Sequence, residues 1–341
     1  MTLKTNPSNH VVRQKKSIFK RVLSILGIIL VTLLGVILIL GLFPVSDKGL
    51  ESQASPADTY EESVSRFQQL QQEEQGQVNN STRSRLLDHR EKTPRVYLMI
   101  HGITNSPLQW LELGEHLYNQ GSNVLILRMP YHGLQSLKVG ELKFLKSQDL
   151  RAYADQAMDI AAGLGDEVVV VGISGGGTVN SWLAQNRPEV SRIVLLAPFF
   201  GIFDVPDLLN PVLVNAFSRL PNISLIKPME PVREWVYRGQ ATRGVAAFLG
   251  IGQEIRSQAK EGTSPDGQVF ILTTAKDDTA NNHTTESLVN HWRQAGADVA
   301  TYQFDASQNI PHNSVDPAAD AAKKQLVYDK ILEFLGEPPM P

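Results

Sequence analysis

A serine between glycines follows a run of four valines, and this arrangement is typical of a catalytic nucleophile. The segment Gly172–Gly176 reads GISGG, comes directly after Val168–Val171, and precedes the helix-like stretch TVNSWLAQN. A sharp turn from strand to helix projects the serine hydroxyl above the sheet, where the start of the helix favours developing negative charge. The pattern predicts that Ser174 is a nucleophile. The alternative is a glycine-rich turn without a chemical role.

A serine nucleophile needs a base, and the base needs an acid that orients it. Two adjacent carboxylates, Asp277 and Asp278, follow the apolar stretch VFILTT. His312 comes later, in the loop Asn309–Asn313. A further histidine, His101, ends the first strongly apolar run and precedes a glycine. The chain therefore contains every group that acyl transfer by a serine requires.

Short apolar runs alternate with helical segments from Arg95 onward. The runs lack polar alternation, as expected for strands buried on both faces. This order predicts an α/β fold, in which helices cover both faces of a mostly parallel central sheet. The predicted strands are Val96–Ile100, Val124–Leu127, Val168–Val171, Ile193–Leu196, Val269–Thr273 and Ala300–Phe304, and the predicted helices are Pro107–Gln120, Leu150–Gly163, Gly176–Asn186, Thr285–Ala295 and Ala318–Leu335.

One long segment interrupts this alternation. The roughly 70 residues between Phe199 and Gly267 contain no predicted strand, and a simple loop in a compact domain is shorter. We interpret residues 200–267 as a mainly helical cap over the open end of the sheet. Part of the cap's apolar surface is expected to line an acyl pocket above Ser174, because ligand pockets of this kind are mostly apolar.

The N-terminal region predicts one transmembrane helix. Residues 22–43 contain no charged residue, and about 20 apolar residues span a bilayer core. A cleaved signal peptide is the main alternative, but its apolar region is usually shorter. The basic tail, residues 1–21, should stay in the cytoplasm, which places the rest of the chain on the extracytoplasmic side. We expect residues 44–93 to be a polar spacer, with an amphipathic helix near Tyr60–Leu70 as the alternative.

Charge and cysteine content narrow the possible partners. Six basic residues precede residue 44, so a chain of net charge −3 carries −9 on its remaining residues. A nucleic-acid-binding surface would be basic, so we expect no nucleic-acid partner. The chain has no cysteine, which excludes disulfides and thiol catalysis.

Residues 94–336 resemble the α/β-hydrolase superfamily, especially its branch of cap-bearing carboxylesterases and monoacylglycerol lipases. The resemblance rests on the GISGG turn, on His101-Gly102 after the first strand, and on the order of serine, acid and histidine. It implies that the backbone N–H groups of Ile103 and Gly175 form the oxyanion hole. It also implies that His312 is the base and that Asp278 is the acid, with Asp277 as the alternative.

The sequence departs from the common family pattern at two places. Ile173 stands where a histidine often precedes the serine, and Met129–Tyr131 replaces a turn that usually contains glycine. Neither change removes a required chemical group, but both leave the subfamily and substrate open.

The predicted function is hydrolysis of carboxylic esters through an acyl-enzyme intermediate, and the ester is expected to be lipophilic. No metal or organic cofactor is expected, and the partners are a small-molecule or lipid ester and the membrane. A thioesterase, acyltransferase or amidase on the same triad, or a catalytically silent binding protein, are the alternatives. The predicted order along the chain is tail 1–21, membrane anchor 22–43, spacer 44–93, hydrolase domain 94–336 and C-terminal tail 337–341.

Overall fold

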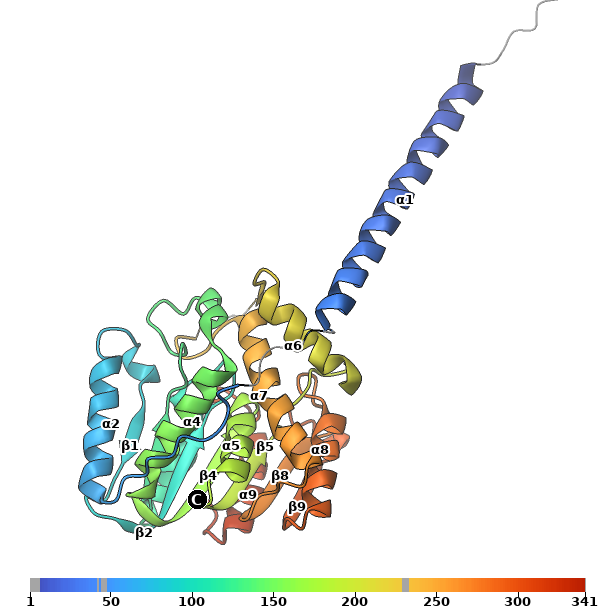
Figure 1. Cartoon of the computed structure of the whole chain (residues 1–341). Helices are drawn as coiled ribbons and strands as arrows, with labels where there is room; N and C mark the ends of the chain where they lie inside the picture. The colour runs from blue at the N-terminus through green and yellow to red at the C-terminus, as the bar shows by residue number, and fades with distance from the viewer. Residues whose placement is uncertain (1–6, 42, 44–47, 229–232, 341) are drawn as a thin grey trace, which may run out of the picture. The chain divides into compact units, whose positions relative to one another are not determined.

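The computed structural model describes residues 7–41, 43, 48–228 and 233–340. The chain divides into two compact units, residues 1–44 and residues 45–341. The first unit contains the single helix α1 (Pro7–Gly41). The second, the C-terminal unit, contains the sheet and its helices (Figure 1).

The C-terminal unit is built on a seven-stranded sheet with the order β1-β3-β2-β4-β5-β8-β9. Its edge strand β1 is antiparallel to β3, and the other pairs are parallel. All six predicted strands are present, and the short β1 was not predicted. The strands are β1 (Arg85–Leu87), β2 (Thr93–Ile100), β3 (Asn123–Leu127), β4 (Gly165–Ile173), β5 (Val190–Leu196), β8 (Gln268–Thr274) and β9 (Val299–Phe304).

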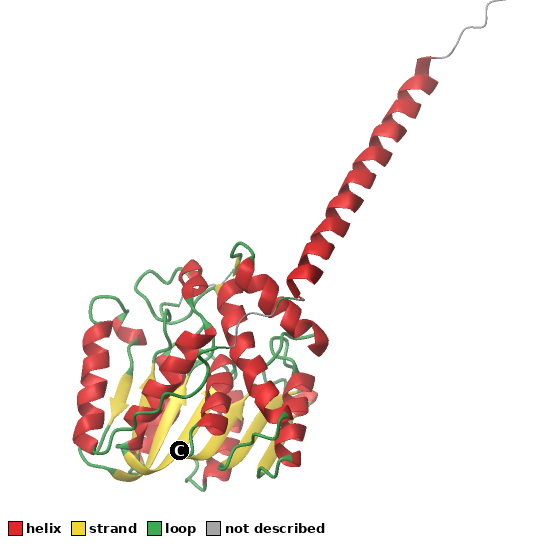
Figure 2. Ribbon diagram, in the orientation of Figure 1, coloured by secondary structure: helices red, strands yellow, loops and turns green. Residues whose placement is uncertain are grey.

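Helices cover both faces of this sheet (Figure 2). Val168 and Val170 of β4 belong to one buried cluster, whereas Val169 and Val171 belong to the cluster on the opposite face. This alternation explains why the strand has no polar residue at its centre. The first face is covered by α4 (Ser147–Ala162), α5 (Gly175–Asn186), α7 (Thr242–Lys260) and α8 (Asn282–Gln294), and the second by α3 (Leu111–Asn119) and α9 (Ala321–Leu335).

The cap is smaller and less helical than predicted. Helix α7 lies within the predicted range 200–267, but its buried side chains join the main core beside α4 and α5. We therefore restrict the cap to residues 200–241. Its elements are the 3-10 helix η4 (Asp207–Leu209), the helix α6 (Asn210–Arg219) and an antiparallel ribbon of β6 (Ser224–Ile226) and β7 (Gly239–Ala241).

The structure contradicts the expected polar spacer at residues 44–93. Helix α2 (Tyr60–Glu74) packs on α4 and buries Phe67 and Leu70 in the main core. Glu74 is buried as well, where it pairs with Arg128 at 2.9 Å. The alternative given for this region, an amphipathic helix near Tyr60–Leu70, is therefore confirmed.

The segment before α2 is also held by the body of the domain. Leu50 is buried, and its carbonyl oxygen accepts a hydrogen bond from Trp182 Nε1 at 3.0 Å. Asp155 of α4 accepts hydrogen bonds from Ser52 Oγ at 2.8 Å and from the Gln53 N–H at 2.9 Å. We call this anchored stretch, residues 48–57, the clasp.

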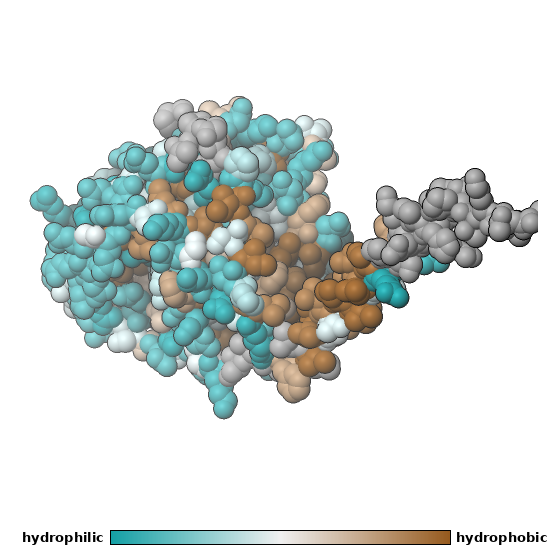
Figure 3. Space-filling model, turned by 90° about the horizontal axis from the view of Figure 1, so that it is seen from above, coloured by the Kyte–Doolittle hydropathy of each residue, from teal (hydrophilic) through white to brown (hydrophobic). Residues whose placement is uncertain are grey.

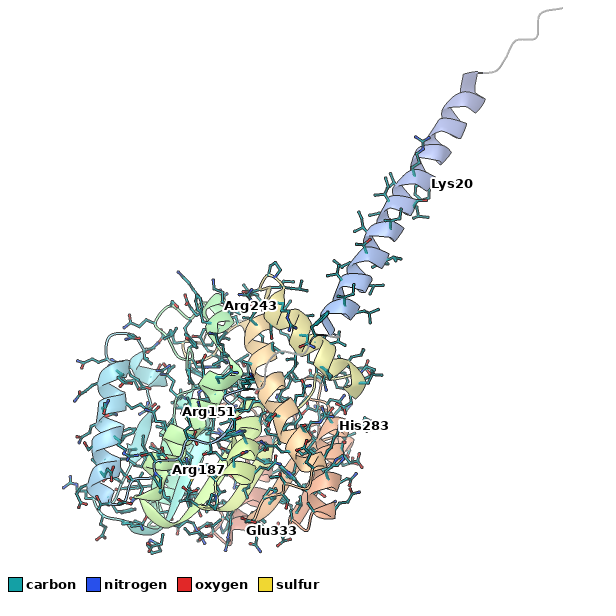
Figure 4. All side chains as sticks on the ribbon, viewed as in Figure 1. Lys20, Arg151, Arg187, Arg243, His283 and Glu333 are labelled. Carbon is teal, nitrogen blue, oxygen red and sulfur yellow. The ribbon has the colours of Figure 1, made fainter. Side chains whose placement is uncertain are left out.

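A buried cation completes the clasp. Arg187 has no exposed side-chain surface and pairs with Asp155 at 3.1 Å and with Asp159 at 2.7 Å. Asp159 also accepts the N–H of Ser55 at 3.0 Å. Arg187 lies near Arg151, another partner of Asp155, on this side of the sheet (Figure 4). One guanidinium therefore compensates the two carboxylates that hold the clasp.

We predict that Arg187→Met lowers the free energy of unfolding by about 3–5 kcal/mol, because Asp159 loses its buried cation and Asp155 keeps its pair with Arg151 but loses the buried one. The measurement is urea denaturation of the full chain in detergent. Lys92→Met is the matched control, because it removes the exposed Lys92–Asp166 pair, which should contribute less than about 1 kcal/mol. Equal losses in the two variants would contradict the role of Arg187.

Candidate active site

Ser174 occupies a strained turn between β4 and α5. Its φ of 54° and ψ of −119° lie in a region that non-glycine residues rarely adopt. Two backbone hydrogen bonds fix this conformation, from the Ser174 N–H to the Leu196 oxygen at 2.9 Å and from the Thr178 N–H to the Ser174 oxygen at 3.0 Å. The turn thus has the strained geometry that the sequence predicts for the turn before a nucleophile's helix.

Glycines on both sides make this turn possible. A Cβ at Gly172 would lie 2.6 Å from the backbone carbonyl carbon of Gly176. A Cβ at Gly176 would collide with the carbonyl oxygen of Ile100, at the end of β2. The backbones of β2, β4 and α5 therefore meet here at a distance that only glycine permits.

His312 is paired with Asp277 at the carboxyl end of the parallel strands, where Ser174 also lies. Its Nδ1 lies 2.9 Å and 3.0 Å from the two carboxylate oxygens of Asp277, and both residues are buried. Asp277 Oδ1 also accepts the N–H groups of Thr279 at 2.9 Å and Ala280 at 2.8 Å. Within the described part of the chain, the buried Nε2 of His312 has no hydrogen-bond partner. That nitrogen is therefore available to accept a proton.

The preference for Asp278 over Asp277 is not supported by the structure. Asp278 is exposed, and its Oδ1 accepts a hydrogen bond from Thr279 Oγ1 at 3.0 Å. The chain turns immediately after β8, because the Asp277 N–H donates to the Thr274 oxygen at 3.2 Å. This turn directs Asp277 inward and its neighbour outward. A spacing counted along the sequence does not reveal where such a turn closes.

The predicted oxyanion residues lie next to each other. A Cβ at Gly175 would be 2.5 Å from Ile103 Cγ1 and 2.7 Å from the Phe248 ring. Gly102 lies beside the serine, since a Cβ there would be 3.5 Å from Ser174 Cβ. The structure therefore brings the loop after β2 against the start of α5.

Two buried histidines support this loop from behind. His101 Nε2 accepts the Met129 N–H at 3.1 Å, and its Nδ1 lies 2.8 Å from the Gly102 oxygen. The ring nitrogens of His132 lie 2.7 Å from the Ile103 oxygen and 2.8 Å from the Pro130 oxygen. Burial lowers the pKa of His101 well below its usual range and the pKa of His132 to about 4.

The role of His132 in supporting this loop was not predicted from the sequence. The segment Pro130-Tyr131-His132-Gly133 gave no signal of a contact with Ile103. Only the folded chain brings the end of β3 beside the loop after β2.

Two further contacts, which sequence reasoning missed, connect the His312 loop to its surroundings. Thr274 Oγ1 donates to the Ile310 oxygen at 2.7 Å and so joins the end of β8 to this loop. Asn105 Nδ2 donates to Asp316 Oδ2 at 2.8 Å and joins the segment after His312 to the loop after β2. These polar side chains belong to no recognisable sequence motif. Each of them pairs with a segment far away along the chain.

The site is nearly closed to solvent. Ser174 is 4% exposed and His312 is 6% exposed. The cap touches the loop after β2, because the Tyr237 N–H donates to the Thr104 oxygen at 2.8 Å. A cavity of about 350 Å³ lies beside Asp277 and is also lined by Phe203. Ser174 and His312 are therefore largely shielded from water.

Comparisons with known proteins agree with the fold of the C-terminal unit. The model of the alpha/beta hydrolase family matches residues 97–322. A search of curated proteins found no match. A structure reported for LipS and LipT, two metagenome-derived lipolytic enzymes, is similar with a TM-score of 0.57 and 20% identity, over 76% of this chain and 99% of that one.

Two monoacylglycerol lipases have a similar fold. A soluble variant of monoglyceride lipase from Saccharomyces cerevisiae aligns with a TM-score of 0.51 and 13% identity, over 74% of this chain and 90% of that one. The monoacylglycerol lipase of Paleococcus ferrophilus aligns with a TM-score of 0.51 and 14% identity, over 74% and 97%. These identities are low, so the likeness is one of fold. The family match covers more than half of the sequence, and the chain therefore belongs to the α/β-hydrolase family.

Proposed function

We propose that this protein is a serine hydrolase that cleaves carboxylic esters, with Ser174 as the nucleophile. The observation that supports this function best is the buried pair of His312 and Asp277, which leaves Nε2 of the histidine unpaired. Ser174 follows β4 and Asp277 follows β8, and the carboxyl ends of parallel strands meet at one edge of the sheet. The three groups of a catalytic triad are therefore gathered at one end of the domain.

In the proposed mechanism, His312 Nε2 takes the hydroxyl proton of Ser174 as Oγ attacks the ester carbonyl carbon. Asp277 holds the ring in the productive tautomer and stabilises the imidazolium. The N–H groups of Ile103 and Gly175 stabilise the oxyanion. His312 then protonates the leaving alcohol, and the ester C–O bond breaks. Water, deprotonated by the same histidine, attacks the acyl-enzyme and releases the acid.

We infer that the ester is lipophilic. Ile103 and the ring of Phe248 lie against Gly175, so the wall next to Ser174 is apolar. Two proteins of similar fold are monoacylglycerol lipases by name. The same triad could cleave thioesters or amides or transfer an acyl group, and the choice among these depends on the substrate pocket.

The substrate class is tested with p-nitrophenyl esters of increasing acyl length, compared with acyl-CoA thioesters and amides. We expect kcat/KM to rise from acetate to medium chains, by up to nearly fourfold for each buried CH₂, or about 0.8 kcal/mol. A steady fall from acetate upward would contradict the lipophilic pocket.

Ser174→Ala is the control, and it should lose both ester hydrolysis and labelling by a fluorophosphonate. Labelling that persists in this variant would contradict the assignment of the nucleophile.

The two adjacent aspartates provide a matched test of the acid. Asp277→Asn should lower kcat by about 10⁴, because an amide stabilises the wrong tautomer of His312. Asp278→Asn should leave kcat within about threefold of wild type, since its carboxylate is exposed and does not contact the ring. Steady-state kinetics with one ester decides between them, and the opposite ranking would restore Asp278 as the acid.

We also propose that α1 is an uncleaved membrane anchor, with the N-terminus cytoplasmic and the C-terminal unit on the extracytoplasmic side. The segment Phe19–Ile39 has a mean hydropathy of 3.1 and is not buried within the protein. Its 21 residues are enough to cross a bilayer. The basic residues before it favour the cytoplasmic side for the N-terminus.

The absence of cysteine allows this topology to be tested with single introduced thiols. A membrane-impermeant maleimide should label Asp166→Cys in intact cells, or in spheroplasts where there is an outer membrane. Ser8→Cys should react only after permeabilisation. The opposite pattern would reverse the topology, and a mature protein that lacks Ser8 would indicate a cleaved signal peptide.

A further inference from the structure

We propose that Gln109 is a positioning residue of the oxyanion hole, which holds the loop after β2 through the Gly102 N–H. This inference rests on the proposed function, because it concerns how the Ile103 N–H is presented to the oxyanion. Gln109 belongs to the 3-10 helix η2 (Pro107–Trp110), which follows this loop, and it is 1% exposed. Its Oε1 accepts the N–H of Gly102 at 2.8 Å.

A solvated polar surface does not account for this glutamine. Viewed from above, the C-terminal unit presents a surface of mixed apolar and polar residues (Figure 3). Gln109 is buried and therefore contributes almost nothing to any surface of the unit. Its carboxamide needs hydrogen-bond partners inside the protein, because burying an unpaired amide is unfavourable.

The direction of the carboxamide is determined by its partner. A backbone N–H can only donate, so the atom of Gln109 that faces Gly102 must be the oxygen. The nitrogen Nε2 is then directed elsewhere, and it is buried without a hydrogen-bond partner among the described residues. An apolar side chain would avoid that unpaired donor but would leave the Gly102 N–H without its acceptor. The glutamine is therefore explained by the main chain of the loop and not by the filling of space.

The short helix that carries Gln109 is fixed to the end of β2. Trp110 is fully buried, and its Nε1 donates to the Ile100 oxygen at 2.8 Å. A Cβ at Gly102 would lie 3.5 Å from Gln109 Oε1 and also 3.5 Å from Ser174 Cβ. The carboxamide and the proposed nucleophile therefore lie beside the same glycine.

The peptide units before and after Gly102 are held by different partners. The unit after it contains the Gly102 oxygen and the Ile103 N–H, which point in opposite directions because a peptide unit is planar. That oxygen accepts the Asn105 N–H at 3.0 Å and lies 2.8 Å from His101 Nδ1. The unit before it is held through its N–H by Gln109. Glycine allows the widest range of φ and ψ, so both units must be held to give the Ile103 N–H one direction.

Adjacent amides in this loop then have different roles. The Gly102 N–H is occupied by Gln109 and does not serve the oxyanion. Within residues 48–228 and 233–340, the Ile103 N–H donates to no protein acceptor, so it is available to a developing negative charge. Loss of the Gln109 acceptor would free the loop to move. The Ile103 N–H would then stabilise the oxyanion less well, whereas ground-state binding of the ester would change little.

Gln109→Met tests this role, because methionine has a similar volume and cannot accept the Gly102 N–H. We expect kcat for a p-nitrophenyl ester to fall about 10- to 100-fold, less than the roughly 10²–10³ lost when an oxyanion donor is removed. KM should stay within about threefold of wild type. Binding of an alkyl trifluoromethyl ketone, whose hemiketal oxyanion mimics the transition state, should weaken in proportion to kcat/KM. The pH profile of kcat/KM should keep its midpoint, since the pair of His312 and Asp277 is untouched.

Gln185→Met is the matched control. Gln185 donates through Nε2 to the Thr263 oxygen at 3.2 Å, and its Oε1 is buried without a partner among the described residues. It is therefore another glutamine with one amide atom bonded to the main chain. It lies near the other end of α5, about 15 Å along the helix from Gly175. Its kcat, KM and affinity for the ketone should equal those of wild type.

Unchanged kcat and ketone affinity in folded Gln109→Met protein would overturn the role of Gln109. A shifted midpoint of the pH profile would also contradict it, because the glutamine would then act through His312, and equal losses in the Gln185 variant would reduce the effect to general packing. Urea denaturation establishes folding, and Gln109→Asn, whose amide is one methylene shorter, takes the place of a variant that does not fold. Wild-type protein that neither hydrolyses esters nor reacts with a fluorophosphonate would overturn the proposed function itself, and this role with it.

Discussion

The contact between the backbones of β2 and α5 is the constraint on which the site depends. The helix can begin against the end of β2 only because Gly176 has no Cβ that would meet the Ile100 oxygen. This approach forces Ser174 into its positive φ. It also directs the loop after β2 over the serine, where Gly102 and Ile103 lie next to it. The proposed nucleophile and the proposed oxyanion donors are therefore brought together by main-chain packing, and the rings of His101 and His132 hold the loop in place.

The sequence predicted the structure correctly where the backbone geometry admits only one kind of residue. Strands buried on both faces require continuous apolar runs, and the six runs became six parallel strands. The glycines around Ser174 are required by steric contact, so the turn could be recognised without coordinates. The preference for Asp278 was not supported, because the direction of each carboxylate depends on how the turn after β8 closes. One hydrogen bond from Asp277 to Thr274 reverses the directions of two adjacent carboxylates, and no spacing in the sequence records it.

The clasp shows a second limit of prediction. Residues 48–57 contain few apolar side chains, and their contacts are hydrogen bonds to Asp155 and Asp159. Those carboxylates can be buried only because Arg187 compensates them. Polar composition therefore suggested a solvated spacer where the chain forms a buried polar network. Such networks depend on partners about 100 residues away, as the contact between Ser52 and Asp155 illustrates, and they leave no local pattern.

The clasp also shortens the stretch of chain that can act as a flexible spacer after the N-terminal helix. A long flexible spacer would let a tethered domain sample many orientations, because the range of a coil grows with the square root of its length. Here the chain is fixed again by Leu50, only a few residues after the apolar helix ends. The side of the domain that carries Leu50 also carries the exposed apolar residues around Phe144, as well as Lys143 and Arg243. Arg243 lies at the opposite end of the C-terminal unit from Glu333 (Figure 4). The polar network inside the domain therefore determines where the chain first contacts the folded body of the C-terminal unit, at Leu50.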